Sequence, residues 1–151
     1  MSMRIRPAHP ADASAVNELL HQLGYPQEGR AATANRIRTW AENPSSAAHV
    51  AEDGDDLLGA IAVHVCPFFE RDGSWGRIVA LVVSGRARGR GVGSQLVAAA
   101  ESFAATRGCV RMEVTSGDRR QEAHAFYRRR RYIDQAGESL RFLRDLPTGG
   151  S

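Results

Sequence analysis

The fold class is decided by the stretch Arg77–Gly108, which reads RIVALVVSGRARGRGVGSQLVAAAESFAATRG. Its first seven residues, Arg77–Val83, form an almost uninterrupted apolar run, as expected for a strand buried on both faces in the centre of a sheet. Glycines follow, and a helical apolar pattern from Leu96 to Phe103 then ends at Gly108. The order strand, glycine-rich loop, helix predicts an α/β domain built around this strand.

The loop between this strand and this helix, Arg88–Ser94 (RGRGVGS), has the chemistry of a phosphate site. The first amides of a helix have no acceptor within the helix, and the helix dipole adds partial positive charge there. Glycines at alternate positions let a phosphate approach the backbone, and Arg88 and Arg90 can add charged hydrogen bonds. We therefore predict an anionic ligand such as a nucleotide or coenzyme A.

Two common nucleotide-binding loops do not fit this segment. A Walker A loop requires a lysine, and the chain contains none. A dinucleotide fingerprint has the spacing G-x-G-x-x-G, whereas Ser94 occupies the position of its last glycine here. An arginine-rich, solvated turn is the structural alternative to a phosphate site.

Outside this stretch, the sequence predicts further strands and helices within one domain over residues 1–146, followed by a flexible tail at 147–151. Asp53-Gly54-Asp55 is a turn signal between two strand-like runs and predicts a hairpin. In chain order, the expected elements are a strand at 4–6, helices at 13–23 and 30–42, strands at 47–52, 57–66 and 77–83, a helix ending before Gly108, a strand at 109–115, a helix at 121–130, and a terminal strand pair within 132–145 that turns at Ala136-Gly137.

Composition narrows the class of protein. Hydrophobic residues at 42% and charged residues at 25% are ordinary for a globular chain of 151 residues. The net charge of +3 suits an anionic ligand but, without a contiguous patch, argues against nucleic acid as a partner. Cys66 and Cys109 form no C-x-x-C pattern, so we expect a reducing compartment and no metal site. Because the sequence shows no signal peptide and no bilayer-spanning window, we expect a cytoplasmic protein.

A second motif lies on the predicted helix at 121–130, where residues 122–127 read EAHAFY. Combined with the R-x-x-G-x-G pattern of Arg88, Gly91 and Gly93, it closely resembles the Gcn5-related N-acetyltransferase (GNAT) family. The resemblance extends over nearly the whole chain, through Gln22–Pro26, Ala80–Val83 and Arg141-Phe142.

This resemblance implies an α/β (α+β) fold with a mixed, mostly antiparallel sheet and the element order βααβββαβαββ. It also implies acetyl-CoA as co-substrate, an amine as acceptor, Tyr127 as a general acid beside the thioester sulfur, and a homodimer as a possible assembly. The implied cofactor-binding residues are Leu81, Val82 and Val83, whose backbone would pair with the pantetheine arm, and Arg88, Gly89, Arg90, Gly91, Val92, Gly93 and Ser94, which would hold the pyrophosphate.

The chemistry of a tyrosine supports that role independently. A phenol with an ordinary pKa near 10 stays protonated at neutral pH, so it can donate a proton to a departing thiolate whose ordinary pKa is near 8.5. The alternative for Tyr127 is an aromatic side chain of the core beside Phe126.

The general base is not identified by the resemblance. An alkylamine is neutral in only about one molecule in two thousand at pH 7, so its proton must be removed. Many relatives place a glutamate where this chain has Val79. His64 and Glu113 are both possible substitutes, and a structural role is the alternative for His64.

Three functions follow from these residues. The first is an N-acetyltransferase that moves the acetyl group of acetyl-CoA directly to a primary amine of a small molecule or peptide. The second, motivated by Val79, is a catalytically inactive CoA-binding module with a regulatory or interaction role. The third is a nucleic-acid binder that uses its arginines and would show strongly salt-dependent binding.

Overall fold

The computed structural model describes residues 3–25, 27–87, 89–115, 121–135, 138–139 and 141–148. The chain forms two compact units, a first unit of Met1–Thr115 and a second unit of Ser116–Ser151. The elements of the first unit are β1 (Arg4–Pro7), the 3₁₀ turn η1 (Pro10–Asp12), α1 (Ala13–Gln22), α2 (Arg30–Glu42), β2 (Ser46–Asp53), β3 (Asp56–Pro67), β4 (Ser74–Val83), the 3₁₀ turn η2 (Gly85–Ala87), α3 (Val92–Thr106) and β5 (Cys109–Val114).

The sheet of the first unit has the strand order β1-β2-β3-β4-β5. The strands from β1 to β4 pair antiparallel with their neighbours, and β5 pairs parallel with β4. The predicted mixed, mostly antiparallel sheet is therefore confirmed. The predicted hairpin is confirmed as well, because Asp53 pairs with Asp56 across a two-residue turn in which Gly54 has a φ of 62°.

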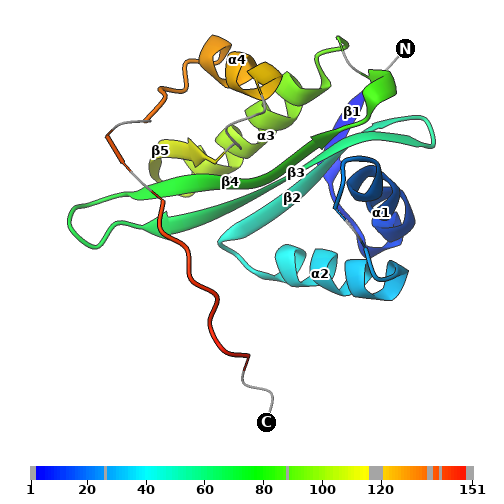
Figure 1. Cartoon of the computed structure of the whole chain (residues 1–151), viewed down its shortest axis with the longest axis horizontal. Helices are drawn as coiled ribbons and strands as arrows, with labels where there is room; N and C mark the ends of the chain where they lie inside the picture. The colour runs from blue at the N-terminus through cyan, green and yellow to red at the C-terminus, as the bar shows by residue number, and fades with distance from the viewer. Residues whose placement is uncertain are drawn as a thin grey trace. The chain divides into compact units, whose positions relative to one another are not determined.

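Helices cover both faces of this sheet: α1 and α2 lie on one face, and α3 lies on the other (Figure 1). On the α1 face, Leu19 packs with three buried residues of the sheet, Val50, Leu57 and Val82. On the other face, the fully buried side chains of α3 include Leu96, Val97 and Ala100. The core therefore lies in two layers, one on each face of the sheet, whose middle strand is β3.

The contact between α3 and the sheet depends on Gly59. A Cβ atom at this position would lie 2.8 Å from the Val82 carbonyl oxygen and 3.0 Å from Leu96 Cδ1. Helix α3 thus packs against the bare backbone of β3. This close approach fixes the position of the helix that begins at the glycine-rich loop.

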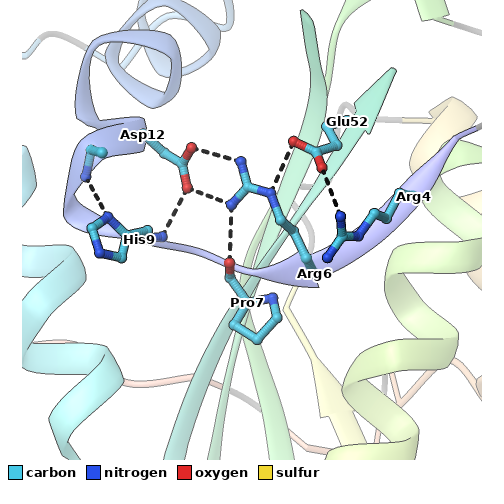
Figure 2. Close-up of polar contacts among 7 residues, drawn as sticks. Arg4, Arg6, Pro7, His9, Asp12 and Glu52 are labelled. Atoms are coloured by element: carbon cyan, nitrogen blue, oxygen red, sulfur yellow. Dashed lines mark hydrogen bonds and ion pairs between the residues drawn. The ribbon is translucent and has the colours of Figure 1, made fainter. Parts of the chain in front are cut away.

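A network around Arg6 joins β1 to β2 and to the start of α1 (Figure 2). The Arg6 guanidinium donates to both Asp12 carboxylate oxygens, at 2.9 and 2.8 Å, and its Nε lies 2.9 Å from Glu52 Oε2. Asp12 also accepts a hydrogen bond from the His9 amide at 2.8 Å. The hydrogen bond from Arg6 is the main reason that the pKa of Asp12 lies below its usual 3.8.

The second unit contains α4 (Gln121–Arg129). At its end the Tyr132 amide donates to the Tyr127 carbonyl at 3.0 Å and the Arg131 amide donates to the Arg128 carbonyl at 3.0 Å, which is a Schellman motif. Arg131 occupies the left-handed position of this motif with a φ of 70°. Glycine is the residue that this position favours.

The predicted terminal strand pair is not found: the described residues between 132 and 148 contain no strand. Phe142, Leu143 and Ile133 are exposed instead of packed. Phe142 and Leu143 are adjacent, so one of the two would face away from the core whichever register a strand adopted. The turn expected at Ala136-Gly137 lies outside the described residues.

Two further findings concern the described part of the chain. Cys66 and Cys109 are free thiols. None of the helices described combines the length and the apolar composition that crossing a bilayer requires.

Replacing Gly59 with alanine should destabilise the fold by about 1–3 kcal/mol, because the new methyl group would overlap the Val82 carbonyl and the Leu96 side chain. Urea unfolding followed by circular dichroism measures this change. Gly85→Ala is the matched control, since a Cβ at Gly85 meets nothing within 4 Å; it should change stability by less than about 0.5 kcal/mol. Equal stability of the two variants would show that α3 does not need the bare backbone of β3.

Replacing Asp12 with asparagine should lower stability at neutral pH by about 1.5–3 kcal/mol, the usual contribution of hydrogen bonds to a charged group. Because the pKa of Asp12 is depressed in the folded state, the wild-type advantage should be complete above pH 3.8 and shrink as the pH falls below that value. Urea unfolding at a series of pH values tests both points. Asp72→Asn, in an exposed loop, is the control and should leave stability nearly unchanged. A wild-type advantage over Asp12→Asn that persisted at the lowest pH would contradict the assignment.

Candidate functional site

The strands β4 and β5 part in the middle of the first unit. They pair from Ser74–Cys109 to Ile78–Val114, and β5 then ends while β4 continues to Val83. Over residues 80–83, β4 pairs with β3 on one side, and from residue 79 to residue 83 no strand among the described residues pairs with its other edge. The parting therefore leaves backbone groups on this edge that can pair with an extended ligand.

A bulge marks the point of parting. Ala62 pairs with Ala80 and Val63 pairs with Ile78, so Val79 is an extra residue on β4 without a partner on β3. Val79 is 48% exposed. The expectation that Arg77–Val83 is buried on both faces is therefore wrong at Val79 and Ala80, which are both exposed at the bulge where β4 leaves β5. The sequence contains no glycine or proline here to signal a bulge.

The cofactor-binding residues expected on β4 offer their backbone rather than their side chains. Val82 is 6% exposed and belongs to the core beneath α1, while Leu81 and Val83 are half-buried. These apolar side chains hold the strand in the sheet. Only main-chain N–H and C=O groups along the edge remain for recognition of a polar ligand.

The loop after β4 ends in a helix N-terminus without a side-chain cap. Gly91 is the N-cap of α3, and the amides of Val92, Gly93 and Ser94 donate to no acceptor among the described residues. Gly89 and Gly91 both have positive φ, 80° and 76°. Unpaired N–H groups at a helix start are complementary to an anion such as a phosphate.

Two arginines at or before this loop form ion pairs with the β2–β3 hairpin. The Arg90 guanidinium lies 3.0 Å from Asp53 Oδ2, so it ties the loop to the β2–β3 hairpin. The preceding Arg86 lies 3.8 Å from Asp56 on the same hairpin. Arg88 lies outside the described residues. Backbone amides are consequently the main donors that the described part of the loop offers to a phosphate.

Tyr127 lies on α4 in the second unit and is half-buried. Its ring contacts two other aromatic rings: Phe126 at a centroid distance of 5.3 Å, edge to face, and Tyr132 at 5.8 Å. The Tyr127 ring is thus packed between the side chains of Phe126 and Tyr132.

A row of polar residues crosses four strands next to the parting. The pairs Ser46–His64, His64–Arg77 and Arg77–Glu113 are partners in register, so their side chains share one face of the sheet. His64 Nδ1 lies 2.9 Å from Ser46 Oγ, and the Arg77 guanidinium lies 3.5 Å from the Glu113 carboxylate. Both residues that the sequence offered as a base therefore belong to this polar row, Ser46-His64-Arg77-Glu113. Sequence reasoning missed Ser46 and Arg77, because only strand register brings them there.

Among the described residues, this is an α/β protein in which an uncapped helix N-terminus follows a strand edge that no other strand pairs with. The model of the acetyltransferase (GNAT) family matches residues 14–131, and the chain belongs to this family. The predicted resemblance is thus confirmed.

Comparison with individual proteins agrees with this family assignment. The chain is 37% identical over 78 residues to the aminoalkylphosphonate N-acetyltransferase of Salmonella typhimurium; the match covers 51% of this chain and 50% of that relative, so it spans half the relative's length. A solved transcriptional regulator from Bacillus halodurans has a TM-score of 0.82 and 22% identity, covering 94% of this chain and 99% of that one. Glucosamine-6-phosphate N-acetyltransferase from Arabidopsis thaliana has a TM-score of 0.81 and 20% identity, covering 97% and 100%. These structures establish the fold.

Proposed function

We propose that the protein is an acetyl-CoA-dependent N-acetyltransferase that moves an acetyl group to a primary amine of a small molecule or peptide by direct transfer. The observation that carries this proposal is the pairing of two features in one unit: the uncapped N-terminus of α3 and the unpaired edge of β4 over residues 79–83. A diphosphate linked to an extended amide-containing arm is complementary to both.

The residues of the first unit fit this co-substrate. The amides of Val92, Gly93 and Ser94, with the turn of Gly89 and Gly91, would hold the pyrophosphate. The backbone of Leu81–Val83 would hold the pantetheine arm as an additional strand. Acetyl-CoA supplies the activated thioester. We include Arg88 and Arg90 in the proposed pyrophosphate site on the basis of their positions in the motif.

Tyr127 is the proposed general acid. A phenol that stays protonated at neutral pH can supply the proton that a departing thiolate needs. The aromatic contacts with Phe126 and Tyr132 support this role, since they pack against the Tyr127 ring. With Cys66 and Cys109 as free thiols, a reducing compartment such as the cytoplasm is the proposed location.

The acceptor is proposed to be an amine, and the names of relatives suggest where a screen should start. One relative acts on aminoalkylphosphonates, and one structural neighbour acts on glucosamine 6-phosphate. Both acceptors combine an amine with an anionic group. The screen should therefore include such zwitterions beside simple alkylamines and peptides.

Val79 favours a second candidate, a CoA-binding module without transferase activity. The bulge exposes an apolar side chain at the position where many relatives carry a glutamate. Tight binding of acetyl-CoA with no acetylation across a broad amine screen would favour this candidate over the enzyme.

Acetyl-CoA at one hundred times its dissociation constant should stabilise the protein by about 2.7 kcal/mol, which a thermal-shift assay detects readily. Replacing Gly91 with alanine should weaken binding, because its φ of 76° is unfavourable for a residue with a Cβ by about 1–2 kcal/mol. The loop would leave the conformation that presents its amides.

Gly108→Ala is the matched control for that variant. Gly108 has a φ of 79° at the other end of α3, and a Cβ there, as at Gly91, meets nothing within 4 Å. Both variants should lose similar stability, but only Gly91→Ala should lose acetyl-CoA affinity. Equal affinities in the two variants would remove the phosphate-binding role of this loop.

Replacing Tyr127 with phenylalanine should lower kcat by about 100-fold, the lower limit for loss of a general acid, while the affinity for acetyl-CoA stays the same. Steady-state kinetics and a binding titration test the two statements separately. Tyr132→Phe removes a hydroxyl from the adjacent ring and should leave kcat within a few-fold of wild type. An unchanged rate in Tyr127→Phe would exclude the general-acid role.

A further inference from the structure

We infer that His64, held by Ser46, is the base that takes a proton from the acceptor amine. This inference rests on the proposed transferase function and assigns a residue to its unfilled role. It is carried by the position of His64 in the polar row and by its hydrogen bond to Ser46, neither of which the sequence shows.

The location of His64 is the first argument. His64 pairs in register with Arg77, two residues before the bulge at Val79 where β4 leaves β5. Its side chain lies on the face of the sheet that α2 covers, as its contact with Trp40 shows. The pantetheine arm is proposed to follow β4 from this same point onward. An imidazole at the parting is therefore next to the place where a thioester and an amine would meet.

The hydrogen bond to Ser46 is the second argument. His64 Nδ1 and Ser46 Oγ are 2.9 Å apart, and no hydrogen bond to Nε2 is found among the described residues. When Nδ1 donates its hydrogen to Ser46, Nε2 carries the lone pair and can accept a proton. The Trp40 ring packs edge to face against the His64 imidazole, with 6.5 Å between the ring centroids. Ser46 is thus a positioning residue that holds the imidazole, and its hydroxyl can accept from Nδ1 in the tautomer whose Nε2 carries the lone pair.

The other candidate base, Glu113, is part of an ion pair. Its carboxylate is paired with the Arg77 guanidinium at 3.5 Å, and Arg77 also donates to Thr115 Oγ1 at 3.2 Å. A carboxylate is also a weaker base than an imidazole at neutral pH. We assign Glu113 and Arg77 to the polar wall of the acceptor site, and the proton transfer to His64.

The proton balance of the reaction agrees with a single base. One proton passes from the ammonium group of the acceptor to His64 Nε2 and from there to water. The amine nitrogen then attacks the thioester carbonyl carbon, a C–N bond forms and the C–S bond breaks. The second nitrogen proton passes to water as the amide forms, the departing thiolate takes the phenol proton of Tyr127, and the tyrosinate takes one proton back from water. The net products are the acetylated amine, free CoA and one released proton.

His64→Asn is the test, because the asparagine amide can keep the hydrogen bond to Ser46 but has no basic nitrogen. With an alkylamine acceptor, kcat/KM at pH 7 should fall about 100-fold or more, with acetyl-CoA affinity unchanged. The deficit should shrink as the pH rises toward the pKa of the amine, where the acceptor is already neutral. With an arylamine, which is neutral at pH 7, the deficit should be much smaller.

Matched variants separate this role from a structural one. His21→Asn makes the same change at an exposed position of α1 and should leave every profile unchanged. Ser46→Ala keeps the imidazole but removes the hydrogen bond that positions it, so it should lose activity about tenfold or more while retaining the pH dependence of wild type. This second variant keeps the inference testable if His64→Asn is unstable.

Other ionisable groups must be followed in the pH profiles. On the same face the charged or titratable neighbours of His64 among the described residues are Arg77, Glu113 and Cys66, with Trp40 from α2 and Ser46 from β2 uncharged. On the opposite face, burial lowers the pKa of His49 below 6.5, so the fold loses stability as the pH falls below that value. Circular dichroism at each pH distinguishes unfolding from loss of the base.

The outcomes are distinct. A pH-dependent, acceptor-dependent deficit in His64→Asn supports the inference. A wild-type rate and profile in that variant overturn it and leave the proposed transferase function intact. If wild-type protein binds acetyl-CoA but acetylates no amine, the transferase function itself fails, and the role of His64 fails with it.

Discussion

The structure depends above all on the pairing of β4, which has a strand partner on both edges in its first half and on one edge in its second half. Along residues 74–78 it is hydrogen-bonded on both edges, to β3 and to β5. At Val79 the extra residue of the bulge interrupts the register with β3, and from there on β4 has β3 as its one strand partner among the described residues. Because backbone groups need partners, the edge left open by this divergence is where a ligand that resembles a strand can bind.

The remaining features of the first unit support that edge. Gly59 lets α3 approach the sheet closely, which places the helix N-terminus directly after the unpaired part of β4. Arg90 ties the glycine loop to Asp53 on the β2–β3 hairpin. On the other face, the network of Arg6, Asp12 and Glu52 connects β1 and β2 to the start of α1 (Figure 2). The site is thus assembled from backbone groups whose positions are fixed by packing and ion pairs elsewhere.

Family membership and the position of the base are separate questions in this chain. The glycine-rich loop and the fold place it among the GNAT acetyltransferases, yet the residue at the bulge, Val79, cannot accept a proton. A row of polar side chains at the end of the paired region supplies an imidazole instead, oriented by Ser46. The chemistry of the transfer requires a base near the parting of the strands but does not prescribe which strand carries it.

Local patterns in the sequence determined the elements through β5, the hairpin turn at Gly54, the glycine-rich loop before α3 and the family, because these depend on residues close together in the chain. The terminal strand pair expected within residues 132–145 is wrong in the described part of that range, which contains no strand. Only the tertiary structure decided the bulge at Val79, the salt bridge of Arg90 to Asp53, and the polar row that joins Ser46 to His64. The physical reason is that strand register is set by long-range pairing and packing: residues 18 positions apart become neighbours only when β2 and β3 align, and no local propensity encodes that alignment.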